Sequence, residues 1–169
     1  DVWVEASYNP VLDASGRTVK VVKYASDVTE RRTRMIDCMA QIEAVDRSFA
    51  VIEFDIDGNV LRANDRFLSL LGYSMNDVRG RHHGMFVESA YRDSAEYQRF
   101  WDALRRGDHA SGRFMRVRKD GREVWISGSY NPVQGADGRI AKVVKFAIDI
   151  TAEVVRDKEN VRVRKALDK

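Results

Sequence analysis

The sequence predicts an α+β fold, a five-stranded antiparallel sheet with short helices on one face, flanked by linker helices. The first observation behind it is the order of patterns from residue 49 onward: two strands, several short helices, three strands and a helix. The second is composition, because 169 residues with 44% hydrophobic, 33% charged and only two prolines suit one globular domain with flanking elements. Such a sheet and its helices pack together by covering one apolar layer.

The third observation is an internal repeat. Residues 2–29 (VWVEASYNPVLDASGRTVKVVKYASDVT) align without a gap on residues 124–151, with 17 of 28 positions identical. A repeat this far apart is typical of an array of similar domains, since solenoid units run roughly 20 to 50 residues. We therefore expect residues 1–30 to be the C-terminal strand hairpin of a preceding, truncated unit. Residues 31–48 would form a linker helix, 49–151 the complete domain, and 152–169 a C-terminal linker helix.

The N-terminal segment begins with two strands rich in β-branched and aromatic residues, joined by the turn signal at residues 13–16. Asp27 and Thr29 are good N-caps for a helix over residues 29–48, which contains no glycine or proline. Its apolar residues follow coiled-coil a/d spacing, although an ordinary amphipathic helix has a similar pattern. They are Met35, Cys38, Ile42, Val45 and Phe49.

The complete unit opens with a hairpin that turns at residues 57–58. Asn64, Ser74 and Ser94 are expected to cap three successive helices, and Gly72 to end the first of them. The helix after Ser94 places aromatic and leucine residues on one face. Two strands around a turn at residues 119–121, a last strand over 140–149 and a helix from Thr151 complete the order.

Charge and motif content argue against several functions. The net charge of +3 arises from 29 basic residues interleaved with 26 acidic ones, so we expect no nucleic-acid partner. A single cysteine excludes an internal disulfide, and no run of residues is apolar enough for a membrane segment. Phosphate-loop, zinc-protease and serine-hydrolase motifs are also missing. We expect a cytoplasmic protein segment that is not an enzyme, with any membrane anchor outside it.

Several motifs of the complete unit resemble the PAS domains of bacterial chemotaxis transducers of the aerotaxis-receptor and biofilm-dispersion type. They are GYSMNDVRGRHHGMF, the strand WISGSYNPV and the closing residues Asp149, Ile150 and Thr151. The resemblance implies the PAS fold and a sensory module that couples ligand or redox state to linker helices. The alternative is a ligand-free PAS module that pairs and spaces neighbouring domains. Fold alone does not choose between them.

The resemblance leaves the cofactor open between FAD, haem and none. Light-sensing relatives carry a reactive cysteine where this chain has His83 and a glutamine where it has Ala147, which argues against that photochemistry. His82 and His83 are the histidines that could serve haem. His83 and Trp101 match positions in the FAD-binding aerotaxis receptor, whereas the residues after the GRHHGMF box differ.

By the same resemblance, a pocket between the sheet and the short helices would have eight lining residues. They are Phe67, Leu71, His83, Met85, Trp101, Leu104, Ile126 and Tyr130. The same residues could instead fill an ordinary core. Signal transmission is assigned to Asp27 and Thr29, and to Asp149 and Thr151, as caps of the two linker helices. The expected partners are adjacent PAS and output domains, and a second copy through the linker helices or an exchanged N-terminal hairpin.

Overall fold

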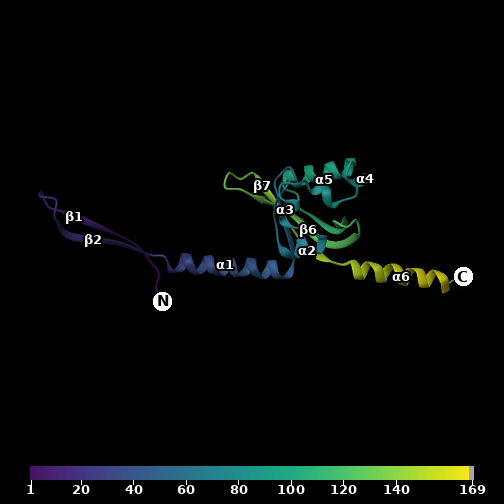
Figure 1. The fold of residues 1–169 in the computed structure, drawn as a ribbon, viewed down its shortest axis with the longest axis horizontal. Coiled ribbons are helices and arrows are strands. Elements are labelled where there is room, and N and C mark those ends of the chain that lie inside the picture. The colour runs from purple at the N-terminus through teal and green to yellow at the C-terminus, as the bar shows by residue number, and fades with distance from the viewer. Residues whose placement is uncertain (168–169) are drawn as a thin grey trace. The chain divides into compact units, whose positions relative to one another are not determined.

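The structure is a computed structural model that describes residues 1–167, and Figure 1 follows its elements along the chain. It divides into two compact units, one covering Asp1–Val45 and one beginning at Asp46. The last two residues of the expected C-terminal helix, 168 and 169, lie outside the described residues.

The N-terminal unit is a two-stranded antiparallel hairpin followed by a helix. Strand β1 (Val4–Leu12) pairs with β2 (Thr18–Asp27), and α1 (Thr29–Ser48) follows after one residue. Nearly every hairpin residue is exposed, including Tyr8 and Tyr24 at 65% each. Both faces of the hairpin are thus open to water within its unit. A hairpin in that state is only marginally stable, so it needs an apolar surface to pack against.

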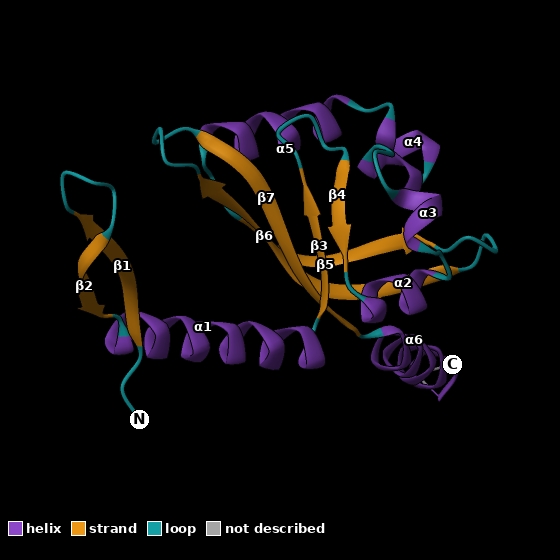
Figure 2. Ribbon diagram, turned by 60° about the vertical axis from the view of Figure 1, so that its left-hand side comes forward, coloured by secondary structure: helices purple, strands orange, loops and turns teal. Residues whose placement is uncertain are grey.

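The C-terminal unit contains the five-stranded antiparallel sheet that the sequence predicts, which confirms the fold class (Figure 2). The strands lie in the order β4-β3-β7-β6-β5. Their bounds are β3 (Ala50–Phe54), β4 (Val60–Ala63), β5 (Ala110–Val117), β6 (Glu123–Gln134) and β7 (Ile140–Asp149). Between β4 and β5 run the helices α2 (Asp65–Leu71), α3 (Met75–Val78), η1 (His83–Phe86), α4 (Ser89–Arg92) and α5 (Ala95–Arg106). Helix α6 (Thr151–Leu167) follows β7.

The helix starts follow the cap signals in the sequence. Asn64 Oδ1 accepts the Phe67 N–H at 3.0 Å and the Val51 N–H at 2.9 Å, so this side chain joins α2 to β3. Ser74 forms a capping box, and Ser94 caps α5. Gly72 ends α2 with φ at +75°, a left-handed conformation that glycine adopts without strain.

One face of the sheet and the short helices enclose the core. Along β6 the alternate residues Val124, Ile126 and Tyr130 are buried, as period-two alternation predicts. Gly128 is the remaining position of this row, between Ile126 and Tyr130. A Cβ there would collide with the Phe146 carbonyl oxygen, so only glycine allows β6 and β7 to approach this closely.

The two hairpins built by the sequence repeat have identical strand registers. Tyr8 pairs with Lys23 as Tyr130 pairs with Lys145. Each hairpin also has its register shift at the same repeat position, next to Leu12 in the first and Gln134 in the second. The repeat is therefore present in the backbone as well as in the sequence.

Candidate functional site

The eight residues expected to line a pocket come together in the core of the C-terminal unit. Seven of them are at most 3% exposed: Phe67, Leu71, His83, Trp101, Leu104, Ile126 and Tyr130. Met85 packs at the edge of this core and lines a surface groove with Tyr73 and His82. The side chains fill the interior, and the polar groups among them determine what the site can do.

His83 is the centre of a buried hydrogen-bond network. Its Nδ1 lies 2.8 Å from the Tyr97 hydroxyl and its Nε2 lies 2.9 Å from the Tyr130 hydroxyl. Arg116 donates from its terminal guanidinium nitrogen to the same Tyr130 oxygen at 2.7 Å. Each tautomer of His83 leaves one phenol proton without an acceptor in the network. With Nδ1–H donating to Tyr97 and Tyr130 O–H donating to Nε2, that proton belongs to Tyr97, which lines a surface groove, rather than to the fully buried Tyr130.

Burial favours the uncharged forms of the histidine and the tyrosines in this network. It lowers the pKa of His83 well below 6.5, and the positive charges of Arg116 and Lys145 lower it further. Burial also raises the pKa of Tyr97 to about 12. Hence an uncharged imidazole lies between two uncharged phenols at neutral pH.

Two buried cations, Arg116 and Lys145, complete the site, and the sequence analysis missed both. Arg116 is 4% exposed and Lys145 is 1% exposed. The Lys145 ammonium lies 4.6 Å above the Tyr130 ring, and Arg116 donates at 2.6 Å to the Met115 carbonyl. Burial, followed by the charge of Arg116, lowers the pKa of Lys145 well below 10.5. Within the part of the chain that the structure describes, no carboxylate pairs with either group.

The signal for these cations was present in the alternation of the strands. Arg116 lies two residues after Phe114, which faces Ile126 across the β5–β6 ladder, and Lys145 lies between the buried residues Val143 and Ala147. Strand register therefore places both side chains on the inner face of the sheet.

The packing of this core does not fit haem or FAD as drawn from the resemblance. Both ring nitrogens of His83 are already hydrogen-bonded, so neither is available to iron. Trp101 packs edge-on against Phe54 at 5.7 Å and Phe100 at 5.9 Å between ring centroids, which leaves no open face for an isoalloxazine ring. No group of three or more metal-ligating side chains is placed to hold an ion among the described residues.

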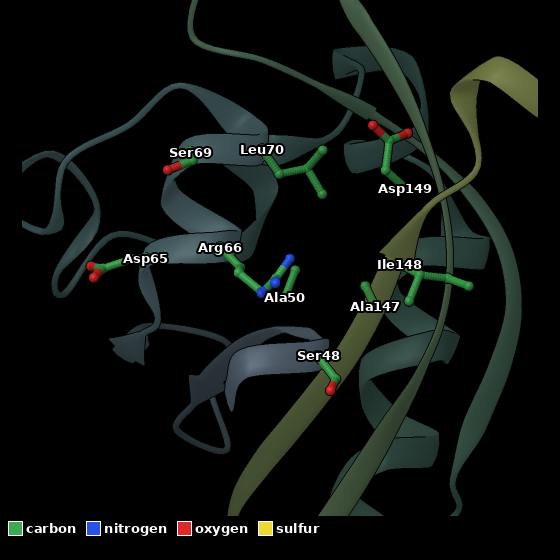
Figure 3. Close-up of a pocket in the computed structure, with 9 residues that line it drawn as sticks. All are labelled: Ser48, Ala50, Asp65, Arg66, Ser69, Leu70, Ala147, Ile148 and Asp149. Carbon is green, nitrogen blue, oxygen red and sulfur yellow. The ribbon is translucent and has the colours of Figure 1, made fainter. Parts of the chain in front are cut away.

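A groove of about 730 Å³ lies between α2 and the end of β7 (Figure 3). Figure 3 shows Arg66 and Leu70 of α2 pointing toward the end of β7, with Ser48 at the end of α1 close to Ala147. The lining consists of Ser48, Ala50, Asp65, Arg66, Ser69, Leu70, Ala147, Ile148 and Asp149. None of the eight predicted lining residues belongs to it. The groove thus adjoins the start of α6 rather than the His83 network.

The start of α6 is fixed to the sheet by a small set of hydrogen bonds, which we call the exit clasp. Asp149 Oδ1 accepts the Thr151 N–H at 2.8 Å and the Thr151 hydroxyl at 2.6 Å. Thr151 Oγ1 in turn accepts the Trp125 N–H of β6 at 3.0 Å. Asp149 therefore accepts the N–H of the first helical residue, and the hydroxyl of that residue, Thr151, joins it to the neighbouring strand.

The N-terminal unit contains a second copy of this clasp. The Thr29 N–H donates to Asp27 at 2.9 Å, and Thr29 Oγ1 accepts the Trp3 N–H at 2.8 Å. In both copies the tryptophan ring also lies under a cation from the first turns of the helix, Arg32 over Trp3 and Lys158 over Trp125. Asp27 and Thr29 are thus placed as Asp149 and Thr151 are.

The sequence profile of the PAS domain family matches residues 48–152, which include the whole sheet, its helices and the exit clasp. The chain belongs to the PAS domain family. Biofilm dispersion protein BdlA of Pseudomonas aeruginosa is 46% identical over 155 residues, covering 92% of this chain and 37% of BdlA. A blue-light-activated histidine kinase of Brucella canis is 27% identical, covering 74% of this chain and 28% of the kinase. This PAS chain therefore spans little more than a third of BdlA and less of the kinase.

Solved structures show the same fold. An RNA-binding light-oxygen-voltage receptor superposes with a TM-score of 0.65 at 22% identity, over 97% of this chain and 44% of the receptor. The PAS domain of a protein from Colwellia psychrerythraea gives a TM-score of 0.59 at 21% identity, over 68% of this chain and 98% of that domain. No helix among the described residues has the length and apolar character to cross a membrane.

Proposed function

We propose that the C-terminal unit is a sensory PAS module that detects a ligand or redox change in its core and transmits it to α6. The observation that carries the proposal is the position of the two sites on shared strands. Tyr130 of the core network and Trp125 of the exit clasp both lie on β6, while Lys145 and Asp149 both lie on β7. Asp149 lies four residues after Lys145 along the extended strand, a distance of about 13 Å.

A change at the core would reach α6 through rigid elements. A ligand that replaces the hydrogen bonds of Tyr130 on β6, or the contact of Lys145 on β7 with the Tyr130 ring, would shift β6 against β7. The clasp converts that shift into a movement of the helix start, because Thr151 is bonded to Trp125 on one strand and Asp149 on the other. A ligand that binds the two strand arrangements with different affinity then changes their populations.

The parent protein is proposed to be a cytoplasmic, methyl-accepting chemotaxis-type transducer with tandem PAS units and an output domain. Its likeness to BdlA supports this. The N-terminal hairpin would close a preceding PAS unit, because it repeats the β6–β7 register and leaves its apolar residues exposed. Residues 31–48 and 152–169 would act as linkers on either side of the unit over 49–151, with no catalytic role.

A second candidate is a ligand-free PAS module that dimerises and spaces its neighbours. Helix α1 supports it, since Met35, Met39 and Ile42 are 60%, 60% and 53% exposed along one stripe. A homodimer through the linker helices, or through an exchanged hairpin, would cover such surfaces. Light scattering with and without residues 1–30 tests the exchanged form. An unchanged monomer would exclude it.

The sensory proposal is tested in the full-length parent protein with Thr151→Val and Asp149→Ala, which remove the clasp bonds. Signalling output should become locked or uncoupled while circular dichroism remains that of the wild type. Ser89→Ala, on an exposed residue at the start of α4, is the matched control. Wild-type output from both clasp variants would refute the transmission route.

An absorption spectrum of freshly isolated protein separates the ligand classes. A Soret band would indicate haem, and paired near-ultraviolet and blue bands would indicate flavin. A protein that absorbs only near 280 nm would favour a colourless ligand or the ligand-free module.

A further inference from the structure

Arg116 and Lys145 place two cationic side chains in the core of the C-terminal unit with no anion beside them. They are 4% and 1% exposed, and no described carboxylate pairs with either. They contact the Met115 carbonyl, the Tyr130 hydroxyl and the aromatic rings of Phe114 and Tyr130. These contacts return only part of the hydration that a charged group loses on burial.

Packing alone does not require charged residues here. Methionine has a shape close to lysine and would keep the contact with the Tyr130 ring without the cost of burying an ammonium group. A residue that lowers stability and is nevertheless placed on the inner face of a central strand is the kind of local conflict that functional sites produce.

The donors left over in this core match an anionic group. Arg116 Nε is buried and has no hydrogen-bond partner, and the same is true of Trp101 Nε1. A guanidinium presents its N–H groups in a planar fork that fits a carboxylate with two parallel bonds. The surrounding surface is aromatic, with Phe114 5.5 Å and Phe100 4.9 Å from the Tyr130 ring centroid. Such a surface suits an organic acid with an apolar body better than a strongly hydrated phosphate.

We propose that the core of this PAS unit binds a small organic carboxylate, most favourably one with an aromatic or aliphatic body, whose carboxylate group is paired by Arg116 and Lys145. This proposal rests on the sensory function proposed above and specifies its ligand class. The bound carboxylate would take the free Arg116 N–H and neutralise the charge that the unliganded core leaves unpaired.

The Tyr–Lys pair recurs in the other copy of the repeat. Lys23 pairs with Tyr8 across the N-terminal hairpin, and its ammonium lies 5.3 Å from the Tyr8 ring. Both side chains are exposed there. If that hairpin closes a preceding PAS unit, the same cation would face its core. The pair then belongs to the repeated unit rather than to one accident of packing.

The ligand would enter from a groove of about 390 Å³ beside α5. Its inner wall includes Tyr97 and Trp101, whose rings lie 5.7 Å and 5.5 Å from the His83 ring. Because side chains fill this core, a ligand must displace some of them, and Tyr97 and Trp101 both line the groove and contact His83, where the chain of bonds through Tyr130 to Arg116 begins. Rotation of Trp101, which makes no indole hydrogen bond, would open the path.

The first test measures thermal unfolding of the full chain with a set of carboxylates and their matched amides. Benzoate, phenylacetate and hexanoate are compared with benzamide, phenylacetamide and hexanamide, and phenyl phosphate and inorganic phosphate serve as the other anions. At a concentration one hundred times its dissociation constant, a binding carboxylate should raise the midpoint by about 5 to 10 °C. The proposal is overturned when no carboxylate exceeds its amide, or when phosphates match the carboxylates.

The second test uses Lys145→Met and requires no knowledge of the natural ligand. Without ligand, the variant should unfold about 3 °C or more above the wild type and should lose the shift caused by carboxylates. Lys142→Met is the control, because Lys142 lies on the same strand with its side chain 37% exposed and pairs with Glu53. A purely structural role would instead lower the midpoint of Lys145→Met, and that result refutes the proposal.

A third measurement covers the case in which the variant does not fold. The Arg116 Nε–H signal in a nitrogen-correlated NMR spectrum of the wild type should move on titration with a carboxylate and stay unchanged with the amide. Hydrogen exchange at Thr151 in the same samples reports the exit clasp. Binding without a change at Thr151 would overturn transmission and leave the ligand proposal standing, whereas an unmoved Arg116 signal would overturn the ligand proposal alone.

Discussion

Removing one hydroxyl, by Tyr130→Phe, should strongly destabilise the C-terminal unit. The Tyr130 oxygen is the point where His83 Nε2 at 2.9 Å and Arg116 at 2.7 Å meet. The phenylalanine ring keeps the aromatic packing and the cation contact, so the change isolates the hydrogen bonds. Each buried group left without a partner costs about 1 to 3 kcal/mol, and two such groups predict a loss of about 2 to 6 kcal/mol.

The assay is urea unfolding followed by the fluorescence of the buried Trp101. Tyr8→Phe is the matched control, since Tyr8 occupies the same position in the first copy of the repeat and is 65% exposed. It should change the free energy of unfolding by less than about 0.5 kcal/mol. If Tyr130→Phe changes it as little as the control does, the buried network does not stabilise the fold, and our account of His83 and Arg116 fails.

Three further outcomes follow from the described contacts. The urea midpoint should rise with pH up to about 6.5 through His83 and, above the lowered pKa of Lys145, up to about 10.5 through Lys145, because burial lowers both pKa values and the unfolded chain binds more protons in those ranges; an unchanged slope on the alkaline side in Lys145→Met would contradict this. Gly128→Ala should cost more than about 2 kcal/mol through its collision with β7, whereas Gly112→Ala, where the nearest atom is 3.7 Å away, should be nearly neutral by the same assay. Asn64→Ala should cost about 2 to 3 kcal/mol in chemical unfolding, since it removes the acceptor of two backbone N–H groups, and a loss below 0.5 kcal/mol would show that water replaces them.

Local patterns were sufficient to predict the fold because each element carries its own signals. Alternation defined β6, and Asn64, Ser74 and Ser94 marked three helix starts. Sequence reasoning also singled out His83. It could not predict that both ring nitrogens are bonded, because Tyr97 and Tyr130 approach His83 only after α5 packs on the sheet.

The cations and the clasp escaped prediction for different reasons. Charge counted by residue type does not say which face of a strand Arg116 occupies, whereas strand register does. Thr151 was assigned to cap a helix because threonine often does so. In the fold the N–H of Trp125, which is distant in sequence, donates to the Thr151 hydroxyl oxygen.

The exit clasp also sets an angular origin for whatever follows α6. Because Thr151 is held to two strands, the helix begins at a fixed azimuth, and each later residue is rotated by about 100° from the one before it. The number of helical residues between Thr151 and the next domain thus determines on which side of the helix that domain is attached. Insertion of one residue after the clasp would turn the output by about a third of a circle, whereas seven residues would nearly restore it. Linker length in this chain is therefore a rotational setting as much as a spacing.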